Sequence, residues 1–223
     1  MDENVIAAMA RWPNVPDVYG WLSLTASGQW RLHPAGDAWQ SPRPSAGTAP
    51  QLGHDDGTGE SISSDQIIRF IDRNYTHDHQ GRWFFQNGPQ RVYVRLDAAP
   101  YILRTGGSTG GDGLSLTTHT GLDVATVQEW WLDDNGRLYA HTEHGPGLVA
   151  GRDLPSVLDA LYTTEGVNLM AALEAASTPS DTLTLRALGA STTPAANAVP
   201  FRTCPATDIP TRLGFVANPH PEK

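Results

Sequence analysis

The sequence contains little cysteine, few basic residues and no long apolar run, and each shortage narrows the range of possible functions. Its single cysteine, Cys204, has no partner for an internal disulfide and lacks the further thiolates of a cysteine metal site. This cysteine usage favours a reducing compartment. We therefore expect a cytoplasmic protein.

Charge and hydropathy argue against two classes of partner. The chain carries 15 basic and 24 acidic residues, a formal net charge of −9 at pH 7, and as a whole it repels polyanions. No stretch approaches the roughly 20 apolar residues that span a membrane. Residues 1–16 include acidic side chains and lack the apolar run of a signal peptide. We expect neither a nucleic-acid partner nor a membrane partner.

Two tryptophan-containing segments, residues 18–33 and 127–141, have the pattern of β-hairpins. Gly28 and Gly136 supply the positive φ that each tight turn requires. Aligning these glycines, a shift of 108 residues, maps four inward positions onto apolar counterparts: Leu22, Leu24, Trp30 and Leu32 onto Trp130, Leu132, Leu138 and Ala140. Two explanations of this correspondence stay open: a structural repeat, and chance or the chemistry common to hairpins.

An amphipathic helix is predicted after each hairpin. Residues 61–75 carry an apolar stripe and a capping-box spacing between Ser63 and Gln66. Residues 151–164 have Asp153 as a natural N-cap and a stripe that includes Leu161, and a second helical stretch follows in residues 165–176. Between the two, residues 82–97 contain an Asn-Gly turn, and residues 99–105 supply a third strand of a meander.

These patterns predict an α+β protein, with antiparallel hairpin or meander motifs and helices repeated in two related halves. Residues 11–105 form the expected N-terminal half and residues 106–178 the second half, while residues 179–223 add a strand and a tail that packs on the core. Residues 41–61 and 106–113 are rich in Pro, Gly and Ser and have the composition of spacers. The apolar residues 213–217 are expected to dock onto a core.

The chain resembles an uncharacterised proteobacterial family of unknown function. The resemblance lies in "RWPNVPDVYGWLSLTASGQW", "WFFQNGPQRVYVRL" and "EWWLDDNGRLYAHTEHGPGLV". More distantly, the order hairpin, helix, meander, hairpin, helix is similar to another uncharacterised family of small α+β bacterial proteins with repeated structural motifs. A role in signal transduction has been suggested for those proteins. The similarity covers roughly residues 11 to 165, and it implies a fold without supplying catalytic residues.

The candidate ligand-binding residues lie on the second hairpin. Strand alternation places Trp131, Tyr139 and His141 in one row opposite the inward positions, and the turn after this row carries Glu143 and His144. Aromatic rings provide contact area, while histidine and glutamate orient polar groups. The alternative is that the C-terminal tail covers this face and makes it a second core.

Motifs for other chemistry are weak. "GGSTGGDG" lacks the Gly-Lys-Ser/Thr and the following helix of a phosphate loop, and no GxSxG nucleophile elbow occurs. Two clusters, at residues 77–79 and 141–144, combine histidine with a carboxylate, the ligand types of zinc, iron or manganese. Their spacing matches no established metal motif.

We therefore predict a non-catalytic protein that binds a small molecule or a partner protein, with a possible regulatory or signalling role. This interpretation includes no catalytic residue, metal or cofactor. The alternative is a metal-dependent enzyme that uses the two histidine clusters, and the sequence leaves the enzyme question open.

Overall fold

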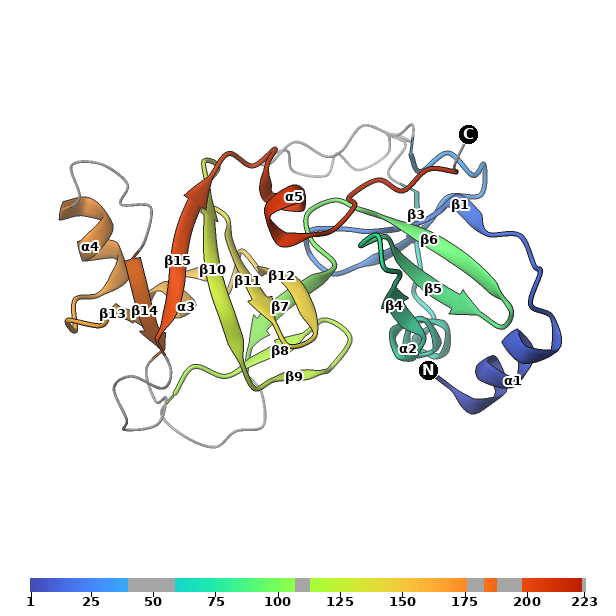
Figure 1. Cartoon of the computed structure of the whole chain (residues 1–223), viewed down its shortest axis with the longest axis horizontal. Helices are drawn as coiled ribbons and strands as arrows, with labels where there is room; N and C mark the ends of the chain where they lie inside the picture. Colours follow the sequence, from blue (N-terminus) through green and yellow to red (C-terminus); the bar gives the residue numbers. More distant parts are fainter. Residues whose placement is uncertain (40–58, 107–112, 176–182, 188–197, 222–223) are drawn as a thin grey trace. The chain divides into compact units, whose positions relative to one another are not determined.

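The structure, a computed structural model, describes residues 1–39, 59–106, 113–175, 183–187 and 198–221 (Figure 1). The chain divides into two compact units. The first contains Met1–Pro100 and Gly214–Lys223, and the second contains Tyr101–Leu213. Both sheets are mixed and helices are few, so the α+β class holds. None of the described helices is long and apolar enough to cross a membrane.

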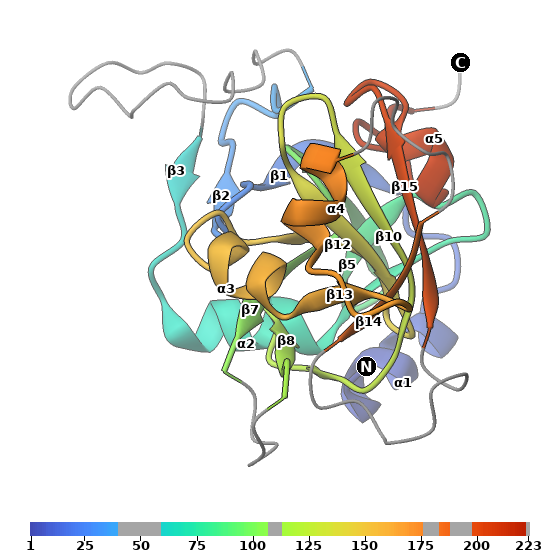
Figure 2. The same cartoon turned by 90° about the vertical axis from the view of Figure 1, so that its left-hand side faces the viewer.

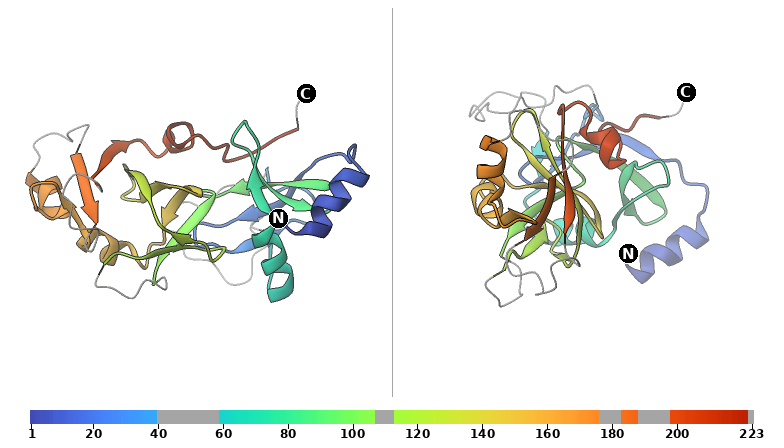
Figure 3. Two further views of the ribbon diagram at one scale, coloured as in Figure 1. Left: turned by 60° about the horizontal axis from the view of Figure 1, so that its bottom comes forward. Right: turned by 60° about the vertical axis from the view of Figure 1, so that its left-hand side comes forward.

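The first unit contains a six-stranded sheet in the order β3-β2-β1-β6-β5-β4. Its strands β1 and β6 pair in parallel, and the other neighbours are antiparallel. Figures 1 and 3 show α2 beside β4 and β5, on one side of this sheet. The elements are α1 (Glu3–Arg11), β1 (Val18–Leu24), β2 (Trp30–Leu32), β3 (Glu60–Ser61), α2 (Asp65–Arg73), β4 (Tyr75–His77), β5 (Trp83–Asn87) and β6 (Gln90–Leu96).

The second unit contains a nine-stranded sheet in the order β13-β14-β15-β10-β11-β12-β7-β8-β9. Figure 2 shows its helices α3 and α4 next to β13. The elements are β7 (Tyr101–Thr105), β8 (Leu116–Thr118), β9 (Asp123–Val124), β10 (Val127–Asp133), β11 (Leu138–Thr142), β12 (Gly145–Val149), α3 (Leu154–Asp159), β13 (Leu161–Thr163), α4 (Leu169–Ala175), β14 (Leu183–Ala187), β15 (Val199–Cys204) and α5 (Ile209–Leu213).

Both predicted hairpins are confirmed, in the predicted register. Leu22 pairs with Leu32 in the first hairpin, and Trp130 pairs with Ala140 in the second. Gly28 and Gly136 adopt φ angles of 81° and 73°, as the turns require. Three of the four inward positions of the first hairpin are buried, and the fourth, Leu32, is exposed.

The two sheets share a run of strand order. Reading from β3, the first sheet follows β3-β2-β1-β6-β5-β4, and the second contains β12-β11-β10-β15-β14-β13. In both runs the two central strands are parallel and the others antiparallel. In both, a helix lies in the sequence between the two outermost strands of the run: α2 between β3 and β4, and α3 between β12 and β13.

Local details of the helices differ from the sequence expectations. The N-cap of α2 is Ser64, without a side-chain cap hydrogen bond, so the predicted capping box between Ser63 and Gln66 does not form. Helix α3 ends at Asp159, and the apolar Leu161 belongs to β13. At the C-terminal end of both helices, strand pairing takes a residue that the apolar stripe assigned to the helix, because Leu161 pairs in β13 and Tyr75 starts β4.

The third strand of the predicted meander belongs to the other sheet. Residues 101–105 form β7, which pairs with β12 in parallel and with β8 antiparallel. The chain turns at Ala99 and Pro100, so β7 does not return along β6. Of the predicted spacers, residues 41–58 and 107–112 lie outside the described residues, whereas Glu60 and Ser61 form β3 against β2.

The C-terminal segment is tied to the first unit by backbone hydrogen bonds. The amide of Leu96 donates to the carbonyl of Ala217 (2.8 Å), and the amide of Val216 donates to the carbonyl of Gly81 (2.9 Å). Phe215 and Ala217 are buried. The apolar residues of this segment therefore dock onto a core.

Candidate functional site

A pocket of about 710 Å³ lies in the first unit, between α2 and the sheet. Its volume falls in the range of small-molecule sites, roughly 300–1,000 Å³. Most of its lining is apolar: Val18, Trp21, Leu22, Leu32, Ile62, Ile67, Ile71, Phe85 and Val92. Its polar lining comes from Glu60, Ser61, Ser63, Ser64, Asn87 and Gln90.

The position of α2 explains why this part of the sheet stays open. Phe70 of α2 meets Phe85 edge to face, with ring centroids 5.4 Å apart. The indole of Trp30 donates a hydrogen bond to Asp72 at 2.8 Å. These contacts hold the helix over β5 and Trp30, and the inner face near Leu22 and Leu32 then lines the pocket.

Three large apolar side chains that line the pocket are exposed: Trp21, Leu32 and Ile67. Exposed apolar surface that gathers at a concave site is typical of ligand or partner binding. Among the described lining residues, Glu60 is the one charged group. The site can therefore hold an apolar body and contact a polar group at its edge.

A second cluster, Ser23, His33 and Asp37, occupies the opposite face of the same sheet. Ser23 Oγ lies 2.8 Å from His33 Nε2, and His33 Nδ1 lies 3.9 Å from Asp37 Oδ1. This connectivity is that of a Ser-His-Asp triad. Ser23 is 0% exposed, however, so its hydroxyl is out of reach of a substrate. The cluster satisfies buried polar atoms, as most buried side-chain networks do.

Burial first, and the Arg95 guanidinium second, lower the pKa of His33 below its usual value, while Asp37 acts in the opposite direction. The neutral imidazole that results accepts or donates within the Ser23 hydrogen bond. Sequence reasoning missed this cluster. The alternation of β1 was the available signal, because it places Ser23 on the face opposite Leu22 and Leu24.

The predicted aromatic row has the expected register but is largely buried. Trp131 pairs with Tyr139, and His141 pairs with Glu129. Trp131 is 7% exposed and Tyr139 3%. The Tyr139 hydroxyl donates to Asp133 at 3.3 Å, and burial raises the pKa of Tyr139 to about 12. These two aromatic residues are buried, as in the alternative of a second core, but residues 216 and 217 of the tail that was expected to cover them bind to the first unit instead.

Glu143 and His144 of the predicted site hold the backbone of residues 123–126, just before β10. The Glu143 carboxylate accepts hydrogen bonds from the amides of Ala125 and Thr126. Burial alone would raise the pKa of Glu143, but these hydrogen bonds hold it below its usual range. His144 donates from Nε2 to the carbonyl of Asp123 at 2.8 Å. His141 Nδ1 lies 2.8 Å from the Gln128 side-chain oxygen.

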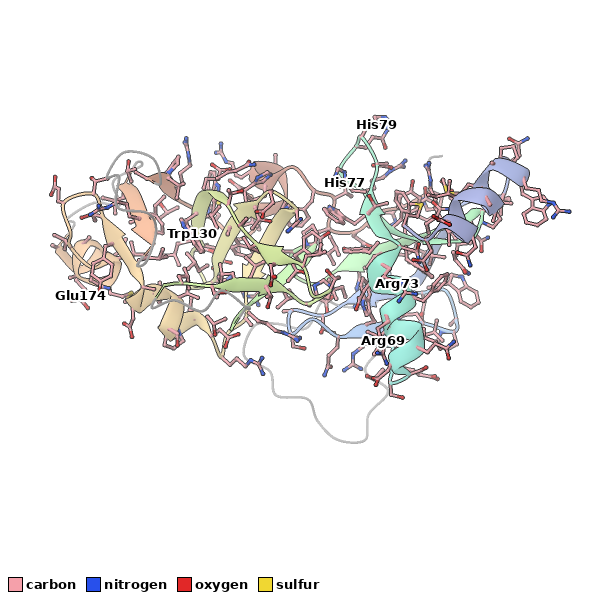
Figure 4. The ribbon with its side chains drawn as sticks, turned by 90° about the horizontal axis from the view of Figure 1, so that it is seen from below. Arg69, Arg73, His77, His79, Trp130 and Glu174 are labelled. Atoms are coloured by element: carbon pink, nitrogen blue, oxygen red, sulfur yellow. The ribbon has the colours of Figure 1, made fainter. Side chains whose placement is uncertain are left out.

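The other histidine cluster has a similar local role. The Asp78 carboxylate accepts hydrogen bonds from the Arg82 guanidinium at 2.7 Å and from the Tyr93 hydroxyl at 3.1 Å. Figure 4 shows His79 at the tip of the loop after β4, pointing away from the sheet. Within the part of the chain that the structure describes, no three His, Cys, Asp or Glu residues are placed to hold a metal ion.

Comparison with known proteins identifies a family and two structures. The DUF2944 family model, whose description reads "Protein of unknown function (DUF2946)", matches residues 1–220. No curated protein matches the sequence. A DUF1285 family protein from Silicibacter pomeroyi DSS-3 is similar over 72% of this chain and 85% of its own, with 15% identity and a TM-score of 0.44. A DUF1285 family protein from Shewanella baltica OS155 is similar over 61% and 89%, with 15% identity and a TM-score of 0.39.

Proposed function

We propose that this chain, which belongs to the DUF2944 family of proteins of unknown function, is a non-catalytic protein that binds a small apolar ligand in the pocket of its first unit. The single observation that supports this proposal is the pocket itself. It combines the volume of a small-molecule site with exposed apolar side chains and a few polar groups.

The chemistry of the pocket supports binding over catalysis. A catalytic site usually brings together titratable groups with shifted pKa values. Among the described lining residues, Glu60 is the one carboxylate, and none is a histidine, cysteine or lysine. The Ser23 cluster, which has the residue types for acyl transfer, lies buried on the other face of the sheet. Within the described residues, neither histidine cluster forms a group that could hold a metal ion, so the proposal does not include the metal-dependent alternative.

The shared strand order supports a proposal about the fold. We infer that the two units are related halves of a structural repeat, in which one half carries the pocket. A ligand-binding half joined to a second half suits the signalling role that the sequence resemblance implies. We also propose a cytoplasmic location, because a single cysteine suits a reducing compartment.

A dye-binding experiment tests the ligand pocket. Nile red is neutral and apolar, and its fluorescence rises in apolar surroundings. We expect saturable binding of one dye molecule per chain. Replacing Ile67 with glutamate should weaken this binding by about tenfold or more, because the dye would desolvate a carboxylate.

The chain offers a matched control for this variant. Ile6 lies on α1 outside the pocket and is 53% exposed, whereas Ile67 on α2 is 50% exposed. Both substitutions, Ile67→Glu and Ile6→Glu, change an exposed helical isoleucine, so we expect similar small effects on stability. Equal dye affinity of the two variants would overturn the proposed pocket.

A further inference from the structure

We propose that the ligand is a cationic amphiphile, an apolar chain that ends in an amine or ammonium group, and that Glu60 binds its charged end. This inference rests on the proposed function, since it assigns the ligand class of the same pocket. It is carried by the strand register that positions Glu60 and by the charges around the pocket.

The register places Glu60 on the apolar face of the sheet. Glu60 of β3 pairs with Leu32 of β2, and Leu32 in turn pairs with Leu22 of β1. Directly paired residues of neighbouring strands project to the same face. Glu60 therefore projects on the same face as Leu22 and Leu32, and Ile62, two residues further on, lines the same pocket.

The pocket contains no lining cation among the described residues to neutralise this carboxylate. Arg31 pairs with Ser61, which puts it on the opposite face, and its guanidinium donates to the carbonyl of Gly59 at 3.0 Å. No ion pair of Glu60 is found with any residue that the structure describes.

The arginines of the neighbouring helix are directed elsewhere. Arg69 of α2 lies 3.8 Å from Asp65 on the same helix. Arg73 forms an ion pair with Asp2 at 3.1 Å, away from the pocket lining. Figure 4 shows both arginines on α2. The negative charge of Glu60 is therefore available to a ligand.

The size of the preference follows from the exposure of Glu60. Exposed ion pairs contribute about 0.2–1 kcal/mol, which corresponds to an affinity ratio of about 1.4- to 5-fold. Because the pair is exposed to solvent, added salt should reduce the ratio. The apolar chain supplies the larger share of the affinity, since burial of apolar surface is the dominant favourable contribution to such binding.

Three probes with the same decyl chain separate the two contributions: decyltrimethylammonium, decanol and decanoate, each measured calorimetrically below its aggregation concentration. We expect decyltrimethylammonium to bind about 1.4- to 5-fold more tightly than decanol, and decanoate to bind more weakly than decanol. In the Glu60→Gln variant the three affinities should converge. Decanol affinity should stay unchanged.

A Glu165→Gln variant removes the same charge from an exposed turn of the second unit and serves as the control. It should keep the wild-type preference. If decanol binds and decyltrimethylammonium shows no advantage, the ligand class is wrong while the pocket stands. A preference that persists in Glu60→Gln would overturn the role of Glu60. If none of the three probes binds, the proposed function itself fails.

Discussion

Replacing Gly81 with alanine should destabilise the first unit by a predictable amount. Gly81 adopts φ 75°, and a Cβ at this position would collide with the carbonyl oxygen of Gly214 in the C-terminal segment. The positive φ alone costs an L-residue roughly 1–2 kcal/mol. Relieving the collision requires the segment to move, which would break the hydrogen bond from Val216 to Gly81, worth about 0.5–1.5 kcal/mol.

The total expected loss is therefore about 1.5–3.5 kcal/mol in the free energy of unfolding. Gly88 provides the control in the same unit, because it adopts φ 58° and its added Cβ would meet a neighbouring atom only at an ordinary 3.9 Å. The Gly88→Ala variant should lose only the cost of the backbone conformation. Urea denaturation of both variants measures the difference. Equal losses would refute the close packing of the C-terminal segment on Gly81.

Three further results are expected. Trp131→Ala should lower the free energy of unfolding, measured by urea denaturation, by about 3–5 kcal/mol, because the ring is buried. A loss under about 1 kcal/mol is typical of a surface residue and would contradict its burial. Burial lowers the pKa of His119 to about 3, so between about pH 6.5 and pH 3 the unfolded chain binds more protons than the folded chain. Across this window stability should fall by up to about 1.4 kcal/mol for each unit by which the pH decreases. A His119→Gln variant should show a shallower acid slope, and an unchanged slope would contradict this assignment. Glu143→Gln should cost about 1 kcal/mol, since it weakens the hydrogen bonds from residues 125 and 126, and full wild-type stability would show that those bonds contribute nothing.

The local structure of the hairpins could be predicted from the sequence because short-range rules determine it. Glycine at a turn and alternation along a strand fix the register of Leu22 with Leu32 and of Trp131 with Tyr139. Helix α2 was also predictable from its apolar stripe.

The pairing of strands that lie far apart in the sequence could not be predicted from such short-range rules. The parallel pairing of β1 with β6, and of β10 with β15, joins strands far apart in the sequence, and no local pattern specifies such partners. The same reason applies to β7, which pairs with β12 and leaves the predicted meander.

The candidate pocket escaped sequence analysis because its residues come from separate elements. Leu32, Ile67 and Val92 belong to β2, α2 and β6, and each has the pattern of an ordinary core residue. For the aromatic row of Trp131, Tyr139 and His141, the sequence indicates the shared face but not its exposure. Alternation shows that Trp131 lies opposite the inward positions, but it does not show whether other residues cover that face.

The most direct test of the central claim is an NMR titration of the isotopically labelled protein with decanol. The proposed pocket predicts saturable amide shift changes that concentrate at residues 60–64, at Ile67 and at Asn87 and Gln90, while Glu143 and His144 stay unaffected. Changes that centre on residues 131–144, or changes that do not saturate, would contradict the claim that the first unit holds the ligand.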